Sequence, residues 1–109
     1  MIKLNYINDA YISYLRKFDS IVLENKNEKR PYVGIVCTVN NINYFVPLSS
    51  PKNKYLNMKN TKDFHKIGNG KYGIINFNNM IPVNKNDLIK IDIEKERDDA
   101  VILFFWKKS

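Results

Sequence analysis

The sequence is poor in the residues that build disulfides and metal sites. Its 109 residues include one cysteine, Cys37, and one histidine, His65. A single thiol cannot form a disulfide within the chain, and one imidazole without clustered carboxylates does not make a metal site. Because Cys37 lies in an apolar run, we expect a buried, inert thiol. The sequence therefore predicts no disulfide framework, no metal site and no cofactor.

Long apolar stretches are also missing. The apolar stretch 100–106 is far shorter than the roughly 20 residues that a membrane-spanning helix needs. Residues 1–6 contain no long apolar segment either, which does not fit a secretory leader. We therefore expect a cytoplasmic protein without a membrane partner. A chain of 109 residues supports one hydrophobic core, so we expect a single domain over 1–109.

Acidic residues are few compared with basic ones: 11 Asp and Glu stand against 18 Lys and Arg, for a net charge of +7. Most of this excess lies between residues 51 and 72, which contain Lys52, Lys54, Lys59, Lys62, Lys66 and Lys71 but only one acid, Asp63. Aromatic side chains, including Tyr55 and His65, are interleaved with these lysines. Lysines that pair with phosphates and rings that stack on bases are typical of single-stranded nucleic acid binding. The alternative is a lysine-rich surface that only keeps the protein soluble.

The N-terminal region predicts a strand over 3–8 and a helix over 10–18. Asn8 or Asp9 is a suitable helix cap. One apolar face is formed by Tyr11, Tyr14, Leu15 and Phe18, at helical spacing. We expect Leu15 and Phe18 in the core. For Tyr11, a core position and a position at the rim of a cleft are both open.

The rest of the chain is typical of an antiparallel sheet. Residues 32–39 and 42–48 read as strands joined by a tight turn at Asn40 and Asn41. Further strands are expected over 73–77 and 88–93, with a strand end or edge at 80–83. Connections this short cannot hold crossover helices. We therefore predict an α+β fold, a compact and highly twisted antiparallel sheet resembling a barrel, with flanking helices.

The candidate site is the exit of the strand 42–48, where apolar residues give way to Ser49, Ser50, Pro51 and Lys52. Pro51 has no N–H for a sheet, so the two hydroxyls and the ammonium group are expected at an exposed edge. Arg30 and Tyr32 stand at the entrance of another strand. There a guanidinium can hold a phosphate and a ring can stack on a base. The alternative for this pair is a solvated charge beside a core tyrosine.

The role of His65 stays open at this point. Imidazole is the usual proton carrier near neutral pH, so His65 is a candidate general acid or base as well as a candidate phosphate contact. Gly68-Asn69-Gly70 predicts a turn, because it lacks the Lys-Ser/Thr ending of a phosphate-binding loop.

Four segments together resemble the ToxN/AbiQ family of ribonuclease toxins from type III toxin-antitoxin systems. They are 11–19 with Tyr11-Ile12-Ser13-Tyr14, 30–36 with Arg30-Pro31-Tyr32-Val33, 44–52 with Pro47-Leu48-Ser49-Ser50-Pro51-Lys52, and 76–83 with Met80-Ile81-Pro82-Val83. They occur in this order between residue 6 and about residue 93. The resemblance implies a barrel like that of the MazF and CcdB toxins.

The resemblance also implies a function. It implies metal-independent cleavage of adenine-rich RNA, which leaves a 2′,3′-cyclic phosphate and a 5′-hydroxyl. By position, the catalytic residues are Ser49, Ser50 and Lys52. The residues expected at RNA are Tyr11, Arg30, Tyr32, Lys54, Tyr55, Lys59, His65 and Lys66. The partner would be an antitoxin RNA pseudoknot that links protomers into a closed ring, in a system for antiviral defence by abortive infection.

One feature departs from the family pattern. Family members continue into a helical C-terminal part, whereas this chain ends in an atypical tail over 94–109. Two functions therefore stay open: an endoribonuclease toxin, and a shortened relative that binds RNA without cleaving it. RNA supplies its own nucleophile, the 2′-OH, so the protein needs only to align it and to stabilise added negative charge. A lysine and serine hydroxyls are sufficient for that.

Overall fold

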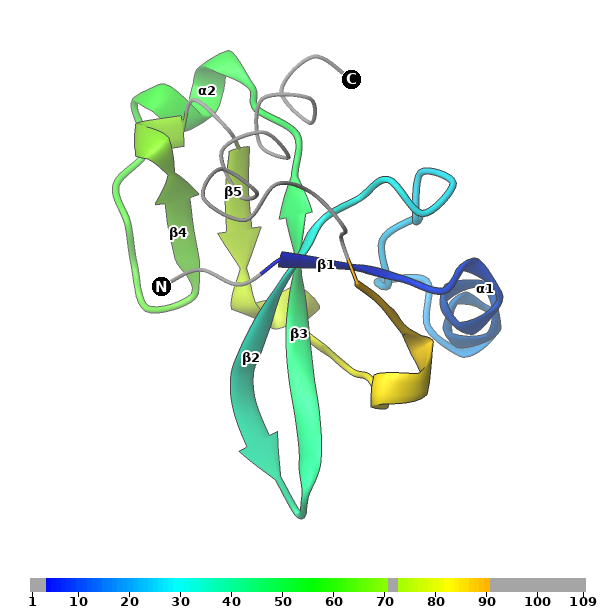
Figure 1. Cartoon of the computed structure of the whole chain (residues 1–109). Helices are drawn as coiled ribbons and strands as arrows, with labels where there is room; N and C mark the ends of the chain where they lie inside the picture. The colour runs from blue at the N-terminus through cyan, green and yellow to red at the C-terminus, as the bar shows by residue number, and fades with distance from the viewer. Residues whose placement is uncertain (1–3, 71–72, 91–109) are drawn as a thin grey trace.

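The computed structural model describes residues 4–70 and 73–90 as an α+β fold (Figure 1). The strands are β1 Leu4–Ile7, β2 Tyr32–Val39, β3 Ile42–Ser49, β4 Phe64–Ile67, β5 Gly73–Asn76, β6 Ile81–Pro82 and β7 Leu88–Ile89. The helices are α1 Asp9–Phe18 and α2 Asn53–Leu56, with 3-10 turns at Gly68–Gly70, Phe77–Asn79 and Lys85–Asp87. The part of the prediction that concerns 91–109, including the tail, lies outside the described residues.

All the strand pairs are antiparallel, in the order β4-β5-β3-β2-β1-β7, with β6 paired to β3. The predicted α+β class and antiparallel sheet are confirmed. Over 4–70 and 73–90, β4 and β7 end the sheet and do not pair with each other, so barrel closure stays a prediction. Strand β4 was not predicted, because its four residues lie in the lysine-rich segment and lack a long alternating pattern.

The hairpin between β2 and β3 follows from its two turn residues. Asn40 and Asn41 have φ values of 51° and 63°, a left-handed conformation that asparagine tolerates better than most residues. Val39 pairs with Ile42 across this turn. Figure 1 shows that the hairpin projects beyond the rest of the molecule. Cys37, on this arm, is only half-buried, with its Sγ 3.8 Å from Met80 Sδ, so the expected burial of the thiol is wrong.

Helix α1 begins as predicted, but only part of the predicted apolar face is covered: Tyr11 and Leu15 are partly buried against the core. The Asn8 side chain accepts a hydrogen bond from the N–H of Tyr11 at 3.2 Å, which caps the helix. Ile12 is its buried residue, at 1% exposure, whereas Phe18 is 74% exposed. The expectation that Phe18 lies in the core is wrong. Periodicity identifies an apolar stripe, but the position of the sheet decides which edge of that stripe is covered.

Strand β3 is the centre of the fold and is buried on both faces. Phe45 belongs to a cluster with Ile7, Ile12 and Tyr32, while Val46 and Leu48 belong to a second cluster with Ile75. Successive side chains on a strand point to opposite faces, so β3 divides the two clusters. Burial on both sides explains why 45–48 is an unbroken apolar run.

Candidate functional site

The predicted site lies where β3 leaves this core. Ser49 pairs with Ile74 of β5 and ends the strand. Ser49 and Ser50 are half-buried, and Lys52, two residues further, is exposed. Lys52 has extended backbone angles and comes directly before α2. The structure therefore brings two hydroxyls and an exposed ammonium group together at one strand exit.

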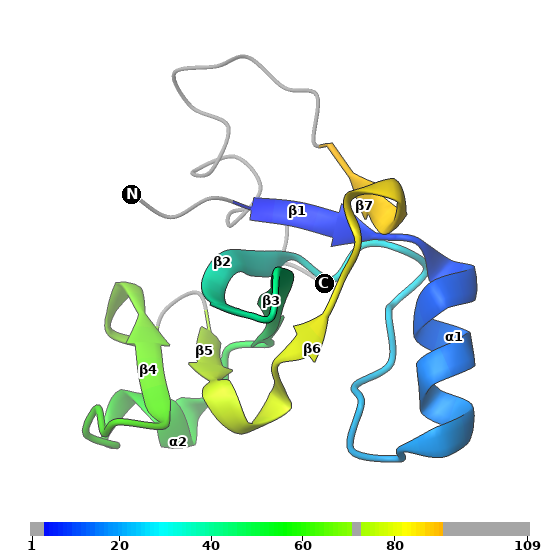
Figure 2. The same cartoon turned by 90° about the horizontal axis from the view of Figure 1, so that it is seen from below.

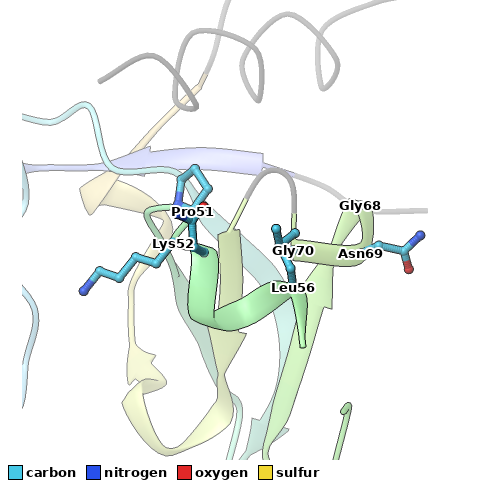
Figure 3. A pocket seen from close by; sticks show the side chains of 7 residues that line it. Pro51, Lys52, Leu56, Gly68, Asn69 and Gly70 are labelled. Atoms are coloured by element: carbon cyan, nitrogen blue, oxygen red, sulfur yellow. The ribbon is translucent and has the colours of Figure 1, made fainter. Parts of the chain in front are cut away.

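A hollow of about 500 Å³ opens beside this exit, between α2 and the turn Gly68–Gly70 (Figure 3). It is lined by Pro51, Lys52, Asn53, Leu56, Gly68, Asn69 and Gly70. In Figure 3 the side chains of Lys52 and Asn69 extend to opposite sides of the hollow, with Leu56 between them. Sequence reasoning identified Lys52 but missed the hollow, because its second wall comes from a turn that lies more than a dozen residues away in the chain.

Two glycines shape this exit. Gly73 has a φ of +115°, and a Cβ there would lie 1.8 Å from the carbonyl oxygen of Ser49. Gly70 has a φ of +92°, and a Cβ there would lie 3.3 Å from the backbone of Tyr55. Only glycine adopts such angles readily and permits such close approach. The start of β5 and the turn before it therefore pack directly on the backbone of the candidate site.

Arg30 lies behind the exit and not on the surface. Its side chain is buried, at 6% exposure. Its Nε donates a hydrogen bond to the carbonyl of Glu24 at 2.7 Å, and its Nη1 donates to the carbonyl of Leu48 at 2.9 Å. Burial lowers the pKa of Arg30, and the neighbouring Tyr32 and Glu24 oppose this shift. The guanidinium thus binds main-chain carbonyls and supports the end of β3, and the contact of Arg30 with RNA stays a prediction.

Two predicted base-stacking tyrosines are buried as well. Tyr32 is 0% exposed and pairs with Pro47. Burial raises the pKa of Tyr32 to about 12, while Arg30 acts in the opposite direction. Tyr55 is 8% exposed, and its ring lies 6.0 Å from the ring of Phe64. Both rings therefore occupy core positions in this structure, and their contacts with bases stay predictions.

Tyr11 is placed away from the strand exit. Its hydroxyl donates a hydrogen bond to the carbonyl of Pro82, which pairs with Tyr44 of β3. Tyr44 precedes Ser49 by five residues, or about 16 Å at the rise of a strand. Figure 2 shows α1 at the opposite end of the molecule from α2. Burial raises the pKa of Tyr11, and Asp87 adds to the effect. The structure does not bring Tyr11 together with Lys52.

Strand β4 places its two basic side chains on different faces. Lys66 and Ser49 both pair with Ile74, so Lys66 lies two strands from Ser49, or about 10 Å away on the same face. His65 pairs with Ile75, the partner of the buried Leu48, and so lies on the other face. The centroid of its ring lies 6.3 Å from the ring centroid of Phe77, in an edge-to-face arrangement. This placement favours Lys66 over His65 as a neighbour of the serines.

The remaining predicted RNA contacts lie on the surface. Lys54 and Lys59 are exposed, and Lys54 Nζ lies 5.5 Å from the ring centroid of Tyr55. Over 4–70 and 73–90, no group of three or more His, Cys, Asp or Glu side chains is arranged to hold a metal ion. None of the helices in that part of the chain is long and apolar enough to cross a membrane.

Comparison with known proteins identifies the family of this chain. Residues 3–107 match the family model described as toxin ToxN of type III toxin-antitoxin systems. Endoribonuclease ToxN of Bacillus thuringiensis subsp. kurstaki is 38% identical over 96 residues, which are 86% of this chain and 50% of that protein. Endoribonuclease AbiQ of Lactococcus lactis subsp. lactis is 37% identical over 103 residues, 84% of this chain and 56% of that protein. The chain thus spans about half the length of these curated relatives.

Solved structures agree with this result. The structure of AbiQ, a lactococcal anti-phage endoribonuclease of a type III system, matches with a TM-score of 0.68 and 30% identity, over 99% of this chain and 73% of that one. A toxin whose selective inhibition by a non-coding RNA pseudoknot has been described matches with a TM-score of 0.68 and 34% identity, over 97% of this chain and 66% of that one. The chain therefore belongs to the ToxN family of toxins from type III toxin-antitoxin systems.

Proposed function

We propose that this chain is an endoribonuclease toxin that cleaves RNA at the exit of β3. The observation that carries the proposal is the position of Lys52, exposed at the rim of a hollow and two residues after the half-buried Ser49-Ser50 pair. Its relatives are named endoribonucleases. Ser49, Ser50 and Lys52 are the proposed catalytic residues.

The proposed chemistry uses the nucleophile of the RNA itself. The 2′-oxygen forms a bond to phosphorus as the bond between phosphorus and the 5′-oxygen breaks, which leaves a 2′,3′-cyclic phosphate and a 5′-hydroxyl. The 2′-OH gives up its proton, and the leaving 5′-oxygen takes one up. Lys52 would stabilise the added negative charge on the phosphate, and Ser50 would donate a hydrogen bond to a phosphate oxygen. No metal ion is required in this scheme.

The proposed RNA surface continues from the exit along further lysines. The exposed Lys54 and Lys59 and the half-buried Lys66 add positive charge, and His65 lies at the far face of β4. Ammonium groups bind phosphates without reading sequence. We propose that this surface takes adenine-rich RNA as substrate and a pseudoknot antitoxin RNA as inhibitor, in a cytoplasmic closed ring of toxin and RNA protomers. A closed barrel belongs to the same proposal.

A second candidate function is RNA binding without cleavage. One observation favours it: Tyr11, a predicted RNA contact, lies on α1 well away from Lys52, and its hydroxyl donates a hydrogen bond to the carbonyl of Pro82.

A cleavage assay separates the two functions. End-labelled adenine-rich RNA is incubated with the protein in the presence of EDTA, and the ends of the products are identified. We expect cleavage, and a loss of at least about 100-fold in rate for Lys52→Ala, since removal of one group that stabilises developing charge costs that much in other enzymes. Ser50→Ala should show a large loss as well.

Matched variants serve as controls. Lys85→Ala and Ser20→Ala make the same changes at exposed positions outside the site. They should cleave at the rate of the unaltered protein. Cleavage that survives both Lys52→Ala and Ser50→Ala contradicts the site, and salt-sensitive binding without any product supports the second function.

A further inference from the structure

The hollow beside Lys52 has the size and the lining of a ligand site. Its volume of about 500 Å³ lies within the range of roughly 300–1,000 Å³ that is usual for small-molecule pockets. Leu56 stands in it with 54% of its surface exposed, although the side chain is apolar. Pro51 adds a second apolar surface. A flat apolar surface that covers this floor removes apolar area from water, which favours binding.

The second wall is a stretch of backbone with few side chains. Gly68, Asn69 and Gly70 form it, and Asn69 has a φ of 57°. A Cβ at Gly70 would already lie 3.5 Å from Leu56 Cδ2. Gly70, the part of the turn nearest to Leu56, therefore has no side chain. Leu56 and the bare turn thus lie against each other and form one open floor, on which the flat face of a planar ring can rest.

The polar groups flank this floor. Figure 3 shows Lys52 on one side of Leu56 and Asn69 on the other, each extending outward from it. An ammonium group binds a phosphate, and an asparagine amide can pair with the edge of a base. A planar ring with a phosphate at one end and hydrogen-bonding groups at the other is a nucleotide.

We propose that this hollow, defined by Pro51, Leu56 and the turn Gly68–Gly70, seats the nucleobase next to the phosphate that Lys52 holds. The proposal rests on the proposed function, which it extends from the cut phosphate to the neighbouring base. The surface lysines bind any RNA backbone, whereas a base seat makes binding depend on the base beside the cut. Leu56 and Asn69 are then residues that determine specificity.

The test uses short single-stranded 2′-deoxy oligonucleotides, which cannot be cleaved because they lack the 2′-OH. One series carries an abasic position at each site in turn, so that charge stays constant while one base is removed. We expect one position at which loss of the base weakens binding about five- to tenfold, a modest stacking contribution. Leu56→Ala should remove this dependence and leave the affinity for the abasic strand unchanged.

Two matched controls isolate the effect. Met58→Ala removes another exposed apolar side chain close to α2 that does not line the hollow, and it should keep the base dependence. Asn69→Gly removes the amide at a left-handed position, and Asn41→Gly makes the same change at the tip of the β2–β3 hairpin, where φ is 63°. We expect Asn69→Gly, but not Asn41→Gly, to change the order of preference among the four bases at that position.

The possible failures are distinct. If every abasic strand binds the unaltered protein as tightly as the intact strand, while Lys52→Ala still abolishes cleavage, the base seat is wrong and the proposed function stands. If base dependence is present but survives in Leu56→Ala, the base is seated elsewhere and the proposal is also wrong. If no oligonucleotide binds and no RNA is cut, both proposals are overturned.

Discussion

Arg30→Met separates the two roles that sequence and structure assign to this side chain. The sequence pattern places Arg30 at a phosphate, whereas the structure buries it at 6% exposure behind the exit of β3. Its guanidinium joins the carbonyl of Glu24, in the loop after α1, to the carbonyl of Leu48, the residue before Ser49. Methionine has a similar length and can fill the space, but it cannot donate to either oxygen.

The expected loss of stability follows from these two bonds. A hydrogen bond to a charged group contributes about 1.5–3 kcal/mol, so the loss of both gives an estimate of about 3–6 kcal/mol in the free energy of unfolding. Each kcal/mol lowers the melting temperature of a domain of this size by about 4–8 °C, so the melting temperature should fall by more than about 10 °C. The exit of β3 should be the region that loosens first.

Urea unfolding and RNA binding are measured side by side. Arg16→Met makes the same change at an exposed position on α1 and should alter stability by less than about 0.5 kcal/mol. A phosphate contact would give the opposite pattern. Arg30→Met would stay as stable as the control, and the slope of log affinity against log salt would become shallower by the amount that one phosphate contact contributes. That result would refute the structural role of Arg30.

Two further predictions concern the backbone and the core of the same region. Gly73→Ala should cost more than about 2 kcal/mol in the free energy of unfolding, because φ is +115° and the new Cβ would meet the carbonyl oxygen of Ser49 at 1.8 Å; thermal unfolding measures it, and a change below about 0.5 kcal/mol contradicts the close approach. Tyr32 should make stability fall between pH 10 and pH 12, because burial raises its pKa from 10.0 to about 12. Below pH 10 the folded and unfolded states both keep the phenol proton. Between pH 10 and pH 12 only the unfolded state releases it, which lowers the free energy of unfolding by about 2–3 kcal/mol. Urea titrations of the unaltered protein and of Tyr32→Phe should differ by this amount across the window, and parallel curves would contradict the burial of the hydroxyl.

Tyr32→Phe is also informative at neutral pH. The hydroxyl of Tyr32 has no hydrogen-bond partner in the part of the chain that the structure describes. Removal of an unsatisfied buried hydroxyl costs little. The variant should therefore be as stable as the unaltered protein at pH 7, which makes it a clean reference for the alkaline loss.

Local chemistry made much of the fold predictable. Asn8 caps α1 because its side chain reaches the N–H of Tyr11 within the same turn. Asn40 and Asn41 close the hairpin because their own backbone angles allow it. Ser49 ends β3 because Pro51, two residues later, has no N–H to donate to a sheet. Each of these signals depends on neighbours in the chain, so the sequence contains it in full.

The burial of single side chains depends on contacts between distant segments. Arg30 looks like a surface charge in its own segment, and only the approach of Leu48 turns it into a buried support. Phe18 continues an apolar stripe, but the sheet covers the Ile12 side of the helix. The four-residue strand β4 exists because β5 offers it a partner.

Helix α1, the hairpin, the strand exit and the excess of lysine beyond it follow from residue type and spacing along the chain. Packing between distant segments settled which basic and aromatic side chains face solvent, and it brought a glycine-bearing turn against α2 to form a hollow at Lys52. The physical reason is that burial is a property of surfaces packed together from separate parts of the chain, and no local pattern records which surfaces will meet.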